Sequence, residues 1–170
     1  MIRPIRKILY ATDLSKNSAY AYFYAADMAR RRDAKIVILH AIEPLPQYVK
    51  AYYERLYDKN VTKVERDQEE EIVQEINKRL DDFCRKAEAH IGSPCADLVS
   101  KILVIRGNPV EEILRVAEVE GCDAIVLGNH GKGFLTQTFL GSVSRSVLDR
   151  TRKPVFIIPL PSEEVDLVWD

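Results

Sequence analysis

Five short apolar runs, separated by segments with helical periodicity, restrict the fold of this chain more than any other feature. Each run is apolar throughout and rich in β-branched residues, as expected for parallel strands covered on both faces. We therefore expect an α/β fold with a mostly parallel sheet and right-handed crossover connections. The runs are KILYA (7–11), KIVILHA (35–41), KILVI (101–105), DAIVLG (123–128) and PVFIIP (154–159).

Four segments between these runs read as helices. The first opens with Ser15, an N-cap candidate, and closes on three arginines, which suit a helix C-terminus. Another has Pro109 in its first turn and stops at Gly121. Because the 170 residues contain no repeat or flexible linker, we expect a single domain over residues 1–170. The predicted helices cover 15–32, 61–91, 109–120 and 142–151.

Charge and apolar content are those of an ordinary globular protein. The formal net charge is −1, with 46% hydrophobic and 30% charged residues, so bulk electrostatics does not point to a nucleic-acid or membrane surface. No stretch approaches roughly eighteen consecutive apolar residues, and the opening MIRPIRKILYATD lacks a signal-peptide pattern. We expect a cytoplasmic protein without nucleic-acid or membrane partners.

The three cysteines, Cys84, Cys95 and Cys122, are odd in number and far apart, without CxxC spacing. This pattern suits a reducing compartment and argues against a disulfide framework or a structural zinc site. Cys84 and Cys122 lie in apolar contexts, so we interpret them as core fillers.

A glycine-rich segment follows the fourth apolar run. Four of the seven glycines lie within residues 128–141, between a predicted strand and a predicted helix. Such a turn offers converging backbone N–H groups and the positive end of the helix dipole, which favour an anion. The P-loop pattern fails because Phe134 stands where lysine is required. The dinucleotide pattern fails because Thr136 replaces its third glycine.

The glycines instead form the pattern G-x2-G-x9-G-S, from Gly128, Gly131, Gly141 and Ser142. This resembles the nucleotide-binding signature of the ATP-binding branch of the universal stress protein family. The resemblance covers most of residues 5–160. KILYATDLSKNS resembles the family's first strand with its aspartate, and ILHAIEP its second strand. GNPVEEILRVAEVEGCDAIVLGNHG resembles its third helix and fourth strand, and GSVSRSVLDRTRKPVFIIP its last helix and strand.

The resemblance implies a fold like that of the adenine nucleotide alpha-hydrolases. This is an open five-stranded parallel sheet in the order 3-2-1-4-5, with helices on both faces. Strands 1 and 4 are then neighbours where the winding reverses, which is where open α/β sheets bind ligands. The implied ligand is ATP, and Mg or Mn would arrive through its phosphates. Three scattered histidines and no spaced carboxylate cluster predict no metal site built by the protein itself.

The residues expected to bind the nucleotide come from several places along the chain. Asp13 is expected to accept hydrogen bonds from ribose hydroxyls, and its alternative role is to cap the first helix. By resemblance, the adenine lies near the backbone of Ala41, with Val143 a weaker candidate. The glycines, the loop lysine and the serines of the last helix would surround the phosphates. The full set is Thr12, Asp13, Ala41, Gly128, His130, Gly131, Lys132, Gly141, Ser142, Val143 and Ser144.

Some of these residues also have simpler interpretations. Ser142 can be the N-cap of the last helix, a role compatible with phosphate contact. Lys132 can equally be a solvated loop lysine. His130 has no nucleophile or carboxylate partner that the sequence can assign, which favours a loop residue over a catalyst. We interpret His40 as a core histidine with a satisfied hydrogen bond and His90 as a helix-surface residue.

The resemblance is weak in two segments, residues 43–60 and the tail at residues 162–170. Residues 43–60 carry two prolines and four tyrosines, which favour a packing or partner surface, with a lid over the site as the alternative. The last strand, within KPVFIIPLP, would be an apolar sheet edge and predicts a homodimer about a two-fold axis. Alternatively the acidic tail, residues 162–170 with Trp169, folds over that edge.

Our leading hypothesis is a cytosolic ATP-binding sensor or regulator with at most slow hydrolysis. The sequence assigns no general base, arginine finger or acidic magnesium cluster for phosphoryl transfer. A second hypothesis is a nucleotide-free dimeric stress module of the same fold, although this chain retains the glycine signature that such members lack. A third is an enzyme on a related adenine-binding sheet, such as an electron-transfer flavoprotein or an ATP pyrophosphatase. The absence of an SGGxDS-type loop in ATDLSKNS opposes the pyrophosphatase.

Overall fold

The computed structural model describes residues 3–44, 46–56, 61–129 and 140–159. In these ranges five strands form one parallel sheet in the order β3-β2-β1-β4-β5, which confirms the predicted fold. β1 and β4 are hydrogen-bonded neighbours at the point where the winding reverses. The strands are β1 (Lys7–Ala11), β2 (Lys35–Ile42), β3 (Val99–Arg106), β4 (Ala124–Gly128) and β5 (Val155–Ile158).

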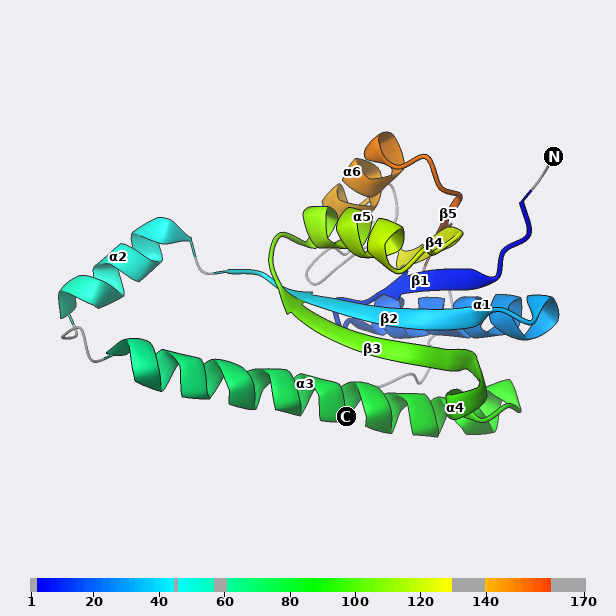
Figure 1. Ribbon diagram of the computed structural model, residues 1–170, viewed down its shortest axis with the longest axis horizontal. Coiled ribbons are helices and arrows are strands. Elements are labelled where there is room, and N and C mark those ends of the chain that lie inside the picture. The colour runs from blue at the N-terminus through cyan, green and yellow to red at the C-terminus, as the bar shows by residue number, and fades with distance from the viewer. Residues whose placement is uncertain (1–2, 45, 57–60, 130–139, 160–170) are drawn as a thin grey trace.

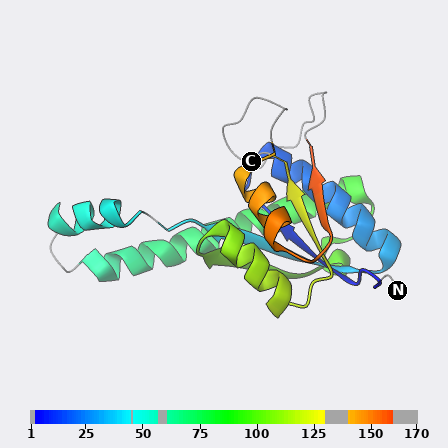
Figure 2. The ribbon, with the colours of Figure 1, turned by 90° about the horizontal axis from the view of Figure 1, so that it is seen from above.

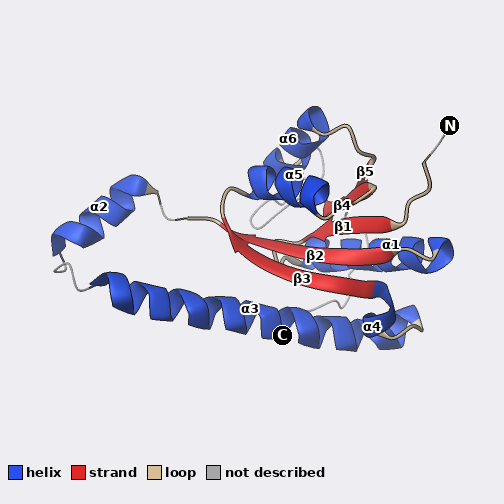
Figure 3. Ribbon diagram, viewed as in Figure 1, coloured by secondary structure: helices blue, strands red, loops and turns tan. Residues whose placement is uncertain are grey.

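Helices cover both faces of the sheet (Figure 1, Figure 3). One face carries α1 (Lys16–Arg32), α3 (Val61–Ile91) and the short α4 (Cys95–Leu98). The other carries α5 (Pro109–Val119) and α6 (Ser142–Arg150).

Alternate residues of each strand pack into different layers. In β1, Ile8 and Tyr10 pack beneath α1 and α3, whereas Leu9 packs with the core of α5 and α6. Because both faces of the central strands are buried, their sequences are apolar at successive positions.

The predicted helix ends agree with the structure to within one or two residues. The Ser15 hydroxyl oxygen accepts a hydrogen bond from the Ser18 N–H at 3.2 Å, so Ser15 caps α1 as expected. The cap of α5 is Asn108, whose Oδ1 accepts from the N–H groups of Val110 and Glu111. None of the helices in these ranges combines the length and apolar character needed to span a membrane.

The tyrosine-rich segment contains a helix that the sequence did not predict, α2 (Gln47–Leu56). Both views show α2 running beside the first turns of α3, and together they project away from the sheet (Figure 1, Figure 2). We call this pair the arm. Tyr48 and Tyr52 are 77% and 62% exposed, so neither serves as core packing.

A disulfide joins Cys84 to Cys95, which corrects the argument against disulfides and the interpretation of Cys84 as a plain core filler. α3 ends at Ile91, and Gly92 reverses the chain at a φ of +72°, a conformation that favours glycine. α4 therefore returns to the side of α3, with the two Cα atoms 5.8 Å apart. Cys84 is buried as expected, and Cys122 is buried and free. Spacing in the sequence could not reveal this pairing because the reversal at Gly92 creates it.

Candidate functional site

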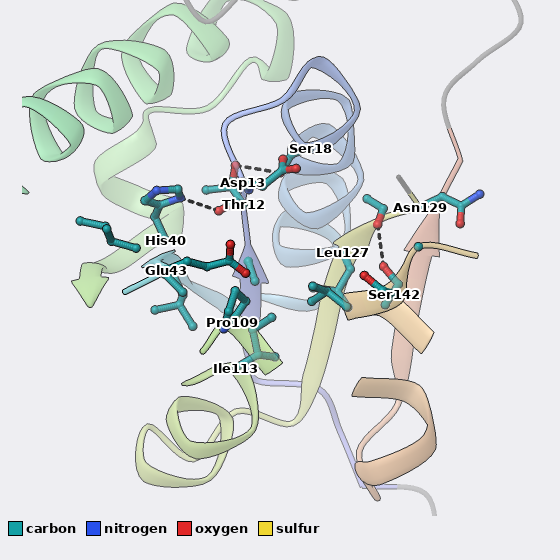
Figure 4. A pocket seen from close by; sticks show the side chains of 18 of the residues that line it. Thr12, Asp13, Ser18, His40, Glu43, Pro109, Ile113, Leu127, Asn129 and Ser142 are labelled. Carbon is teal, nitrogen blue, oxygen red and sulfur yellow. Dashed lines mark hydrogen bonds between the residues drawn. The ribbon is translucent and has the colours of Figure 1, made fainter. Parts of the chain in front are cut away.

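A pocket of about 500 Å³ opens at the carboxyl ends of the strands, where the winding reverses. Its volume falls within the usual range for small-ligand sites. Among the described residues, its lining comes from the β1–α1 turn, the end of β2, one turn of α3, the start of α5, the end of β4 and the start of α6. Figure 4 shows these segments around the cavity.

The β1–α1 turn is held by its own side chains. The Thr12 hydroxyl oxygen accepts from the Leu14 N–H at 3.0 Å and from the Ser18 hydroxyl at 2.7 Å. Leu14 has a φ of +63°, a costly backbone conformation for a residue other than glycine. Asp13 Oδ1 accepts from the Ser15 N–H at 2.9 Å. Asp13 thus supports the turn that precedes α1, and its carboxyl group also lines the pocket.

Gly128 is a glycine because α1 passes close to the end of β4. A Cβ atom here would lie 2.8 Å from Oδ1 of Asn17 and 3.3 Å from its backbone carbonyl carbon. Asn17 is 2% exposed, and its side-chain amide donates to the Ile158 carbonyl at 3.3 Å. Close packing against α1 therefore requires a glycine at position 128. The glycine signature alone did not reveal this requirement.

The start of α6 is tied to the end of β4. The Gly141 N–H donates to the Asn129 carbonyl, and the Ser144 hydroxyl donates to the Gly128 carbonyl, both at 2.9 Å. Gly141 is the N-cap residue and makes no side-chain cap, so the prediction of Ser142 as N-cap is wrong. The first N–H groups of α6 consequently lie at the pocket without a capping side chain, an arrangement that favours anions.

His40 and Glu43 occupy the β2 side of the pocket. His40 Nδ1 lies 2.7 Å from the Thr12 carbonyl oxygen. Since a carbonyl only accepts, Nδ1 carries the proton. His40 is a satisfied histidine, as predicted, but it lines the pocket instead of lying within the core. Figure 4 shows the Glu43 side chain reaching into the pocket towards β1.

Most of the residues predicted to bind nucleotide come together here. Three fall outside the described residues: His130, Gly131 and Lys132. The other eight line this pocket: Thr12, Asp13, Ala41, Gly128, Gly141, Ser142, Val143 and Ser144.

Sequence reasoning missed several lining residues. Glu43 could have been found, because it follows Ala41 by two positions at the end of the same strand. Ile76 could not, since only the packing of α3 brings it to the pocket. In the described part of the chain, no three His, Cys, Asp or Glu side chains group closely enough to hold a metal. Of the described part of the tyrosine-rich segment, Glu43 lines the pocket, whereas no described side chain of α2 is among the lining residues.

Comparisons with known proteins agree with this architecture. The model of the universal stress protein family matches residues 4–159. Universal stress protein MJ0577 of Methanocaldococcus jannaschii is 27% identical, with 90% of this chain and 94% of that protein aligned. A universal stress protein of Methanothermobacter thermautotrophicus is 30% identical, with 87% and 91% aligned.

Solved structures give the same result. The structure of MJ0577 superposes with a TM-score of 0.69, covering 95% of this chain and 100% of that one. A universal stress protein solved in complex with cAMP shares the fold, with a TM-score of 0.57 and 21% identity, over 94% of this chain and 100% of that one.

Proposed function

Because this chain belongs to the universal stress protein family, we propose that its pocket binds an adenine nucleotide, ATP foremost, and that the protein acts as a nucleotide-dependent sensor or regulator. The observation that carries the proposal is the position of the pocket. It lies at the strand reversal between the Asp13 turn and the start of α6, where open α/β sheets bind their ligands.

The pocket has suitable chemistry for each part of the nucleotide. Leu39, Ile113 and Leu127 give an apolar wall next to Ala41 for the adenine. The Asp13 carboxylate can accept hydrogen bonds from ribose hydroxyls. The start of α6 offers backbone N–H groups to the phosphates, through which Mg or Mn would bind. The universal stress protein solved with cAMP, itself an adenine nucleotide, supports this ligand class.

Regulation fits the described lining better than efficient catalysis. Two carboxylates line the pocket, and Oδ1 of Asp13 already accepts from the Ser15 N–H. The sequence assigns no general base, arginine finger or acidic magnesium cluster for phosphoryl transfer. We therefore propose at most slow ATP hydrolysis.

We also propose a homodimer through β5. This strand pairs with β4 on one side, and its four residues, Val155–Ile158, are only partly buried. An apolar sheet edge is a surface for strand pairing unless it is covered. The alternative cover, the tail at residues 162–170, lies outside the described residues.

Calorimetric titration of the purified protein with ATP, ADP, AMP and GTP tests the nucleotide proposal. We expect one nucleotide per chain with adenine preferred. Asp13→Ala should weaken binding about tenfold or more, because a hydrogen bond to a charged group is lost. Glu118→Gln, on an exposed residue of α5 outside the lining, is the matched control and should bind as the wild type does. A folded wild-type protein that takes up none of the four nucleotides would refute the proposal.

A further inference from the structure

The nucleotide pocket leaves one chemically active feature unexplained: the bond between Cys84 and Cys95, which joins α3 to α4. We propose that these two cysteines form a reversible thiol–disulfide site that exchanges with small thiols and disulfides of the glutathione class. A chain of this size with a two-sided apolar core does not need a single cross-link in order to fold.

The surrounding residues hold the two cysteines together independently of the bond. Glu88 Oε1 accepts a hydrogen bond from the Cys95 N–H at 2.7 Å, which fixes the start of α4 against α3. Arg30 of α1 donates to the Ile91 carbonyl at 2.9 Å and holds the last turn of α3. The sulfur atoms therefore stay close after reduction, so the bond can form again without refolding.

The two sulfur atoms differ in access. Cys84 is 2% exposed, whereas Cys95 is only partly buried. A small thiolate reaches the Cys95 side of the bond more readily, which makes Cys95 the point of attack and Cys84 the leaving group. The Tyr22 hydroxyl lies 3.3 Å from Cys84 Sγ and 3.9 Å from Cys95 Sγ, and it donates to the departing Cys84 thiolate.

The exchange balances without a further oxidant. The thiolate of a small thiol attacks Cys95 Sγ, the bond between Cys84 and Cys95 breaks, and its electron pair leaves on Cys84. A second small thiol then attacks the mixed disulfide and releases Cys95. Two small thiols thus become one small disulfide, and the protein gains two thiols. The reverse sequence, starting from a small disulfide, closes the bond.

Thiol counting on the full chain tests the site. The folded protein is treated with reduced or oxidised glutathione, quenched in acid, unfolded, alkylated and weighed. We expect three alkylated cysteines in the reduced protein and one, Cys122, in the oxidised protein. Burial raises the pKa of Cys122 to about 11, so it should take no adduct. Cys122→Ser is the matched control and should retain the exchange.

Single variants identify the attacked sulfur. Cys84→Ser should accumulate glutathione on Cys95, whereas Cys95→Ser should take none. If Cys84→Ser does not fold, acid quenching of the wild type in excess thiol should still trap the adduct on Cys95. Tyr22→Phe should slow reduction about fivefold, the effect of losing one hydrogen bond to the leaving group.

The proposal is overturned by a bond that resists reduction in the folded protein, by thiols that stay free in oxidised glutathione, or by an adduct on Cys84 or Cys122. None of these readouts depends on nucleotide binding.

Discussion

The Ser144 hydroxyl donates a hydrogen bond of 2.9 Å to the Gly128 carbonyl and joins the two ends of the glycine-rich segment across sixteen residues. Ser144 is only 5% exposed, and the bond itself is partly buried beside the pocket. It connects the end of β4 to the first turn of α6, the two elements proposed to contact the phosphates.

Ser144→Ala should therefore lower the free energy of unfolding by about 1 to 2 kcal/mol, because it leaves a carbonyl without its hydroxyl donor. Urea denaturation measures this change. Ser142→Ala is the control, because Ser142 is exposed and does not cap α6. The free energy of unfolding of this variant should stay within about 0.5 kcal/mol of the wild-type value. Equal losses in both variants would contradict the assigned role of Ser144.

Gly128→Ala should destabilise the protein by about 1 to 3 kcal/mol, because the new methyl group meets Asn17 of α1. Removing the Asn17 side chain in a double variant should recover part of the loss, which a double-mutant cycle measures. Gly121→Ala is a useful comparison. Nothing lies within 4 Å of its added Cβ, and it is strained only by a φ of +64°. No coupling between positions 128 and 17 would show that close packing does not explain Gly128.

Glu43→Gln should weaken the binding of ATP, ADP and AMP by the same factor, about three- to tenfold. Glu43 reaches into the pocket from the β2 side, away from the start of α6, and should meet the part that these nucleotides share. Calorimetric titrations of the three ligands give the ratio. If Glu43→Gln instead bound ATP more tightly, or weakened only AMP, the phosphates and not the shared part would lie near β2. The proposed orientation would then be reversed.

Acid should weaken the link between α5 and α6. The Arg150 guanidinium hydrogen-bonds Glu111 at 2.6 Å and lowers the pKa of that carboxyl group. The pKa of Glu111 is lower in the folded protein than in the unfolded chain. The resulting stability is fully present above the unfolded-state pKa and is lost as the pH falls through the folded-state pKa. Both side chains are exposed, so the effect should be small. Urea midpoints from about pH 7 to about pH 3 should show a shallower acid loss in Glu111→Gln than in the wild type.

Ile157→Pro should separate the proposed dimer while leaving each subunit folded. The Pro154 carbonyl accepts from Ile125 of β4, and the Ile158 carbonyl accepts from Asn129, which follows β4. Because the backbone groups of successive strand residues point to opposite sides, the N–H of Ile157 points away from β4, to the open edge. Proline removes that donor without removing a bond to β4. Sedimentation velocity should shift from dimer to monomer. The variant Phe156→Pro, which does lose a bond to β4, should unfold instead.

The periodicity of the sequence was sufficient to predict the strand runs and four helices, because buried parallel strands and amphipathic helices leave strong local patterns. Asp13 and Gly141 could be placed at one pocket because each follows or precedes a predicted element and the family resemblance implied the strand order. The features that the sequence did not predict depend on contacts between residues far apart in the chain. Ile76 reaches the pocket through the packing of α3, and Cys95 meets Cys84 through the reversal at Gly92. Neither leaves a signal in local spacing.

The single helix α3 reaches from the arm to the cross-link at Cys84, and Ile76 lies between them at the pocket wall. At the usual rise per residue, its 31 residues span about 45 Å. Its far end, at the arm, lies well beyond the part of the helix that packs against the sheet. A slight change in the angle of α3 at the pocket wall would move the exposed tyrosines of α2 by a larger distance. A partner protein bound at the arm could therefore detect a change that leaves the core unaltered.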